Sequence, residues 1–177
     1  MATVPSFRTW ATSEVVTAAE LNSNIRDAGQ FWVTNRPRAR LRQTSAQSLS
    51  NGVWTGVNFD TEDLDNDGGH STSSNTSRYV AVTAGWYLVG GIGAITFNGS
   101  GQRGTRLAVN GTVQPGTQTQ NNTGSAGGTD MAVGTQLIFL NAADYVELQV
   151  MQNSGGSINT QVTSPEQSTL NVVWIGS

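Results

Sequence analysis

A long β-strand is predicted over Trp86-Tyr-Leu-Val-Gly-Gly-Ile-Gly-Ala-Ile-Thr-Phe97, where aromatic and apolar residues alternate with glycines that allow bulges or close backbone approach. Asn110-Gly111 is a hairpin signal between two further strand patterns. About eight to ten short strands separated by Gly, Asn and Ser turns predict an all-β sandwich, jelly roll or barrel. The other strand patterns lie at 38–43, 53–59, 78–82, 105–109, 112–114, 135–140, 145–151 and 169–175.

The first 36 residues differ from the rest because they contain a helical pattern. Thr17 and Glu20 have the spacing of a capping box, and Leu21, Ile25 and Ala28 follow at helical spacing. Gly29 is the expected end of this helix of about three turns, which needs a surface to pack on. The sequence therefore predicts an N-terminal arm with one short helix over 1–36, followed by a β domain, or knob, over 37–177.

Composition excludes several classes of protein. The 177 residues carry a net charge of -3, no cysteine and one histidine, and all nine basic residues are arginine. This argues against a nucleic-acid binder, a disulfide-held fold and a cysteine metal site. Charged residues are 12%, against about 25% in average domains. No apolar run reaches the roughly 18 residues of a membrane span, and the N-terminus does not resemble a secretory signal.

The β-strand region resembles the C1q-like/TNF-like jelly roll over roughly residues 38–177. The similarity rests on Trp54, Val57-Asn-Phe59, Asp65, Gly68-Gly-His70, Val82-Thr-Ala-Gly-Trp-Tyr-Leu-Val89, Arg106-Leu-Ala-Val-Asn-Gly111, Leu140-Asn-Ala-Ala-Asp-Tyr-Val-Glu-Leu148 and Leu170-Asn-Val-Val-Trp-Ile175. Ala143-Asp144 departs from the Gly-Asp usual in that family. The resemblance implies a compact homotrimer.

The N-terminal zone resembles a segment found at the front of tailed-bacteriophage virion proteins. The similarity lies in Trp10-Ala-Thr-Ser-Glu-Val-Val-Thr-Ala-Ala-Glu-Leu-Asn22 and Ile25-Arg-Asp27. It implies an attachment module that docks the domain behind it on the virion. The residues expected to dock on this platform are Phe7, Trp10, Val15, Leu21, Ile25, Phe31 and Trp32.

Three functions compete. The first is a bacteriophage virion structural protein, a homotrimeric surface knob such as a capsid decoration, head-fibre or minor structural protein. The second is a receptor- or glycan-binding module of the tail or baseplate, a minor tail protein whose polar loops at 98–104, 115–130 and 153–166 would contact the host. The third, an enzyme, is disfavoured because no nucleophile–base pair is recognisable.

Asp63, Asp65 and Asp67 alternate ahead of Gly68, which is how a calcium-binding loop begins. Position 74, where such a loop would supply a bidentate glutamate, is Ser. A looser Ca²⁺ site and an acidic turn in which Asp side chains cap backbone amides both remain open, and we favour the turn. No other cofactor is expected.

Two further sets of residues have alternative roles. Alternating arginines can share one strand face, where they would bind an acidic partner or another subunit, or form a solvated edge. Aromatic residues within the strand patterns belong to the core or to a trimer interface. The arginines are Arg36, Arg38, Arg40 and Arg42, and the aromatics are Trp54, Phe59, Trp86, Tyr87, Phe139, Tyr145 and Trp174.

Overall fold

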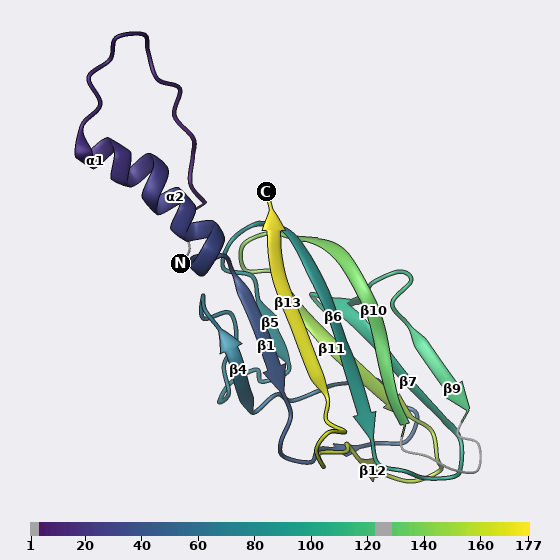
Figure 1. The fold of residues 1–177 in the computed structure, drawn as a ribbon. Helices are drawn as coiled ribbons and strands as arrows, with labels where there is room; N and C mark the ends of the chain where they lie inside the picture. The colour runs from purple at the N-terminus through teal and green to yellow at the C-terminus, as the bar shows by residue number, and fades with distance from the viewer. Residues whose placement is uncertain (1–3, 123–128) are drawn as a thin grey trace.

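Two antiparallel sheets pack face to face, and a helical arm projects from one end, in the computed structural model that describes residues 4–122 and 129–177 (Figure 1). The five-stranded sheet has the order β10 (Thr129–Leu140), β6 (Gly85–Ile95), β13 (Thr169–Gly176), β1 (Arg38–Arg42) and β4 (Thr61–Asp65). The second sheet has the order β3 (Thr55–Gly56), β11 (Tyr145–Gln152), β7 (Gln102–Val109) and β8 (Thr112–Val113), with β5 (Arg78–Val80) beside β11 and β9 (Thr119–Asn122) beside β7. β2 (Ser48–Leu49) pairs with β12 (Ile158–Asn159). The predicted all-β sandwich is confirmed.

The core fills the space between the two sheets. Along β6, Tyr87 and Val89 point inward and are buried, whereas Trp86 and Leu88 point outward. This is the period of two that places alternate side chains on opposite faces. The buried cluster also includes Leu41, Leu49, Phe59, Tyr79, Leu107, Leu140, Leu148, Leu170 and Trp174.

The glycines of β6 allow its neighbours to come close. A Cβ at Gly91 would lie 2.4 Å from the Thr169 carbonyl oxygen on β13, and one at Gly93 would lie 2.2 Å from Thr105 Oγ1 on β7. Neither contact is sterically possible, so both positions require glycine. The close approach that the sequence predicts for this strand is confirmed.

The arm helix is longer than the sequence predicts. It runs without a break through α1 (Ala18–Leu21), a π-helical stretch (Asn22–Arg26), α2 (Asp27–Gln30) and a second π-helical stretch (Phe31–Asn35). The expected end at Gly29 is wrong, because one glycine costs a helix only about 1 kcal/mol and burial of Phe31 holds the following turn. The helix ends where Arg36 precedes Pro37 and takes an extended ψ of 129°. No helix in residues 4–122 and 129–177 is long and apolar enough to cross a membrane.

Two of the expected exposed loops are shorter than predicted. β7 already begins at Gln102, and the Arg103 side chain is fully buried, donating to the carbonyl oxygens of Asn98 and Ser100 at 3.0 Å. This buried guanidinium folds the preceding turn onto the sheet. The predicted loop 153–166 likewise contains β12.

Three further segments differ from the prediction. β9 and the start of β10 lie within the predicted loop 115–130, of which residues 123–128 lie outside the described part of the chain. The acidic segment Thr61–Asp65 forms strand β4, which the sequence does not predict. The predicted strand 53–59 is regular only at Thr55–Gly56.

Candidate interaction surfaces

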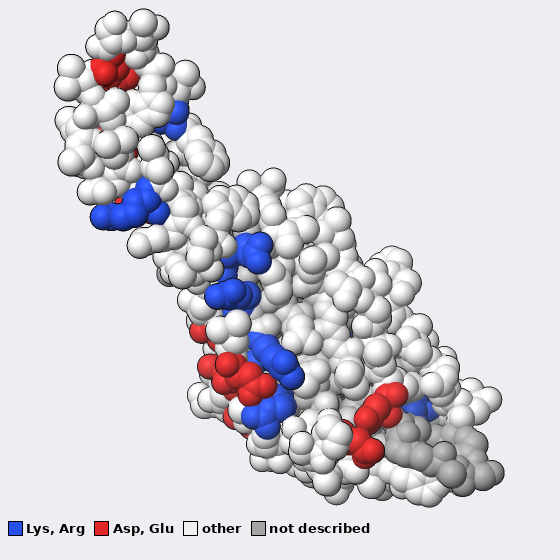
Figure 2. All heavy atoms as spheres, in the orientation of Figure 1, with Lys and Arg blue, Asp and Glu red and all other residues white. Residues whose placement is uncertain are grey.

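The outer face of the five-stranded sheet is largely apolar over β13, β6 and β10, whereas β1 carries outward-facing arginines. Trp86 and Phe139 lie opposite each other on β6 and β10, and their rings meet edge to face at 5.4 Å. The neighbouring pair Leu88 and Leu137 is also directly opposite, and the Leu137 side chain is 55% exposed. Ile92 and Ile175 extend the same exposed set. Figure 2 shows no charged atoms over the middle of this face, where β13, β6 and β10 lie in Figure 1.

A hollow of about 410 Å³ lies in the middle of this apolar face. Gly90 and Gly91 form its floor because they have no side chains, and Leu88, Ile92 and Val133 are among its walls. An antiparallel sheet usually turns polar side chains to water on its outer face. A large exposed apolar surface of this kind marks a site of association.

The aromatic residues predicted for the core or a trimer interface lie in three places in the structure. Phe59, Tyr87 and Trp174 are buried in the core. Trp86 and Phe139 are exposed on the outer face of the sheet, at 43% and 45%. Trp54 and Tyr145 instead lie on the other sheet, each half-buried beneath an arginine: Arg106 stacks 4.1 Å from the Trp54 ring and Arg78 stacks 4.0 Å from the Tyr145 ring.

Four members of the apolar face are not among the site residues predicted from the sequence: Leu88, Ile92, Leu137 and Ile175. The sequence does contain a signal for this face, because apolar residues occupy both odd and even positions of the strand patterns at 86–97 and 135–140. A strand with one solvated face is expected to be apolar at alternate positions only.

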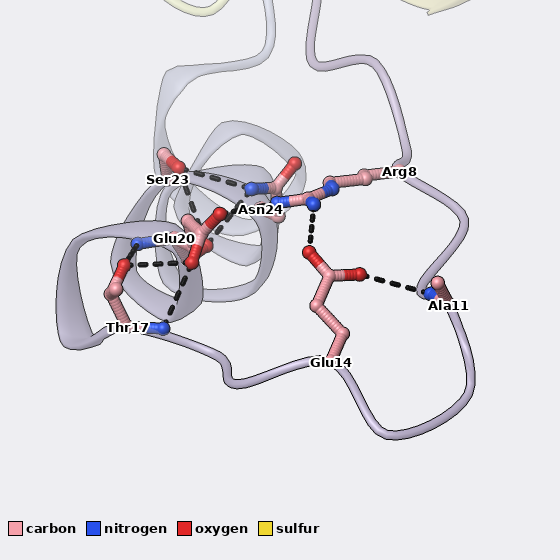
Figure 3. Close-up of polar contacts among 7 residues, drawn as sticks. All are labelled: Arg8, Ala11, Glu14, Thr17, Glu20, Ser23 and Asn24. Atoms are coloured by element: carbon pink, nitrogen blue, oxygen red, sulfur yellow. Dashed lines mark hydrogen bonds and ion pairs between the residues drawn. The ribbon is translucent and has the colours of Figure 1, made fainter.

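The polar contacts of the arm close a loop ahead of the helix (Figure 3). Arg8 pairs with both Glu14 and Glu20, and the Ala11 amide donates to Glu14 at 2.9 Å. Thr17 accepts from the Glu20 amide at 3.3 Å while Glu20 accepts from the Thr17 amide at 2.9 Å, so the predicted capping box is confirmed. These bonds from Thr17, with help from Arg8, lower the pKa of Glu20 to about 2.

Most residues expected to dock on a platform are accessible. Phe7, Val15, Leu21, Ile25 and Trp32 are exposed. Trp10 is half-buried, with the Arg8 guanidinium 4.6 Å from its ring.

Phe31 is the exception in the docking set, because it is 3% exposed and belongs to the knob's own core cluster. Its ring meets Trp174 edge to face at 5.4 Å, and Trp32 lies 5.5 Å from the same indole. The assignment of Phe31 to docking is therefore wrong. The reason is that the helix continues far enough to bring Phe31 onto Trp174, where it anchors the arm.

The four alternating arginines fall into two pairs. Arg42 Nη2 lies 2.9 Å from Asp63 on β4, and Arg40 Nε lies 3.4 Å from the same carboxylate. The Nε atoms of Arg36 and Arg38 are buried and have no hydrogen-bond partner within the described ranges. Arg40 and Arg42 therefore have a partner in their own chain, whereas the Nε atoms of Arg36 and Arg38, at the arm–knob junction, have no acceptor among the described residues.

The acidic segment does not converge on one point. Asp63 faces the arginines of β1, Asp65 accepts from the Gly68 and His70 amides at 3.1 and 2.8 Å, and Asp67 accepts from the Tyr79 hydroxyl at 3.1 Å. Among the described residues there is no group of three acidic or histidine side chains that could hold a metal ion. The geometry does not fit the Ca²⁺ interpretation, because each carboxylate has a separate partner; it fits the capped turn.

His70 is held between two backbone carbonyls, with Nδ1 2.8 Å from the Arg78 oxygen and Nε2 3.1 Å from the Phe59 oxygen. The ring therefore ties the acidic segment to β5. Its role in this structure is to form hydrogen bonds within the fold.

Asp67 makes the stability of the knob dependent on pH. Burial raises the pKa of Asp67 to about 6, against the opposing hydrogen bond from Tyr79, and the charge of Asp65 adds to the rise. A carboxyl whose pKa is higher in the folded state than its unfolded value of about 3.9 loses stabilising free energy as the pH rises through 6. Asp67→Asn is therefore expected to raise the melting temperature relative to wild type at pH 7.5, and this gain should vanish near pH 4. An equal difference in melting temperature between variant and wild type at both pH values would contradict the raised pKa of Asp67.

The fold is similar to crystal structures of murine APRIL. The structure at pH 5.0 matches with a TM-score of 0.60 and 13% identity, over 79% of this chain and 99% of that one. The structures at pH 8.0 and 8.5 match with TM-scores of 0.58 and 0.54 and identities of 12% and 11%, over 79% and 78% of this chain and 99% of theirs. No protein-family model matches the sequence, and a search of curated proteins gives no match either. At this identity the similarity shows the fold alone: the knob is a TNF-like jelly roll.

Proposed function

We propose that this chain is a non-enzymatic structural protein of a bacteriophage virion. Three copies form a surface knob, and the N-terminal arm docks that knob on the capsid or tail. The apolar outer face of the five-stranded sheet is the observation that carries this proposal.

The apolar face supports the trimer. A closed ring of three copies would bury Trp86, Leu88, Leu137 and Phe139, which a monomer leaves exposed. Burial of apolar surface is worth roughly 25 cal/mol per Å², so burying this face favours association. Thr135 and Asn171 are the polar residues beside the hollow in this face, and Figure 2 shows no charged atoms there.

The arm supports the docking role. It projects beyond the sheets (Figure 1), and Val15, which precedes α1 at the arm tip, is exposed. At its junction with the knob, Arg36 and Arg38 have buried Nε atoms without acceptors in the described part of the chain, and a buried donor left unpaired costs roughly 1–3 kcal/mol. Both arginines are half-buried as whole residues, so carboxylates of a protein platform would be suitable partners for their positive charge. The resemblance of residues 10–27 to phage virion segments supports a virion platform.

Immunogold labelling with an antibody against the knob tests the location, and variants of the arm tip test the docking. We expect gold on the head or tail of particles, and we expect Val15→Asp to reduce the amount of knob on purified particles at least tenfold. The control Thr112→Asp places the same charge at an exposed position of β8 and should leave the amount unchanged. Unlabelled particles, or full occupancy by the arm-tip variant, would contradict the proposal.

A further inference from the structure

The arm has an open apolar groove. Its first segment runs back along the helix and leaves a groove of about 320 Å³, whose walls include Phe7, Trp10, Ile25 and Trp32. The Phe7 and Ile25 side chains beside it are 75% and 60% exposed. A structure of one helix and one extended segment has no core of its own in which to bury them, so the groove requires an apolar occupant.

The spacing of the helix residues indicates what the occupant is. Leu21, Ile25, Ala28 and Trp32 follow at intervals of four, three and four, which is the spacing of a seam where helices pack on one another. Ala28 is already covered within its own chain, whereas the other three are exposed. Three of the four seam residues are thus uncovered in a single copy.

The charges of the arm permit copies to approach. Arg8 pairs with Glu14 and Glu20, and Arg26 pairs with Asp27. Each acidic side chain of residues 4–36 is therefore neutralised within its own arm. Two arms brought together meet little like-charge repulsion.

The arm groove lies beside the end of the sheet where the knob's apolar face carries Trp86. Trp32 lies 5.5 Å from Trp174, and the same end of the sheet carries Trp86, which pairs with Gly176 of β13. In a closed trimer all three arms leave from the same end. In a three-fold assembly, the same residues of each copy meet only at the symmetry axis. An apolar patch that packs against the equivalent patch of the other copies must therefore face that axis.

We propose that the three arms pack against one another with the groove and Ile25 turned toward the symmetry axis, so that the occupant of each groove is the arm of another copy. This inference rests on the proposed homotrimer. It assigns Ile25 and Trp32 to contacts between copies and leaves the arm tip at Val15 for the platform.

A disulfide between copies tests the inference, because the native chain has no cysteine. Ile25→Cys should form dimers of linked chains under mild oxidation, since a disulfide requires Cα atoms within about 7 Å. Ser23→Cys is the matched control, because residue 23 is exposed on the opposite side of the helix and should stay unlinked. Light scattering on both reduced variants establishes whether the knob is trimeric.

The outcomes separate the two proposals. A trimeric mass, with linked chains in the Ile25→Cys variant and unlinked chains in the Ser23→Cys variant, supports the bundle of arms. A trimeric mass without linked chains in the Ile25→Cys variant, or with equal linking in both variants, overturns the bundle and leaves the trimeric knob intact. A monomeric mass overturns both. Trypsin gives a second readout: Ile25→Gln should speed cleavage after Arg26 at least tenfold, whereas the equally uncharged Ser23→Gln should not, and equal rates would overturn the inference.

Discussion

Leu137→Glu is expected to convert the protein from three chains to one. The residue lies in the middle of the apolar face, opposite Leu88, and is 55% exposed, so the substitution does not disturb the core of a single chain. In the trimer, three carboxylates would be buried against apolar side chains without partners, which costs several kcal/mol for each charge. Light scattering at micromolar concentration measures the change in mass.

A control distinguishes the effect of position from that of charge. Thr112→Glu adds the same charge at an exposed position on the other sheet, away from the apolar face, and should retain the mass of wild type. If Leu137→Glu also kept the wild-type mass, the outer face of the five-stranded sheet would not be the surface of association.

Trp174→Ala is expected to lower the free energy of unfolding by about 3–5 kcal/mol, the usual cost of removing a large buried aromatic side chain. The indole fills the core beneath β6, and its Nε1 donates to the Ala84 carbonyl at 3.0 Å. It is also the surface on which Phe31 packs, so its loss should release the arm helix as well as destabilise the knob.

Urea unfolding at a fixed protein concentration measures this loss, because the stability of an oligomer depends on concentration. Trp54→Ala is the comparison, since this tryptophan is only half-buried and stacks on Arg106 at the other sheet. Trp54→Ala should lower the free energy of unfolding by less than half as much as Trp174→Ala. A loss below about 1 kcal/mol for Trp174→Ala would contradict the role of the indole as the centre of the core.

The sequence predicted those parts of the fold that have a strong local signal. The period of two and the glycines of β6 predicted a central strand approached closely by its neighbours, and the capping box predicted where the arm helix begins. Such features depend on residues adjacent in the chain. The low-identity structural similarity then bears out the jelly roll over the knob.

The features that the sequence did not predict depend on tertiary contacts. The helix passes Gly29 because Phe31 packs on Trp174, which is far away in the sequence. The acidic segment becomes strand β4 because Asp63 pairs with Arg40 and Arg42 on β1. Neither contact can be inferred from the secondary-structure propensity of neighbouring residues. Whether an arginine of this set is paired likewise depends on which residue the strand register places near it.

The most direct test of the account is the solution molar mass of the full chain, measured by light scattering with calcium and again with chelator. The account predicts three times the chain mass of 18.7 kDa in both conditions, because the apolar face drives assembly and no carboxylate cluster among the described residues awaits a metal ion. A mass of one chain in both conditions would contradict the trimeric knob. A trimer that dissociates in chelator would contradict the assignment of Asp63, Asp65 and Asp67 to contacts within the fold.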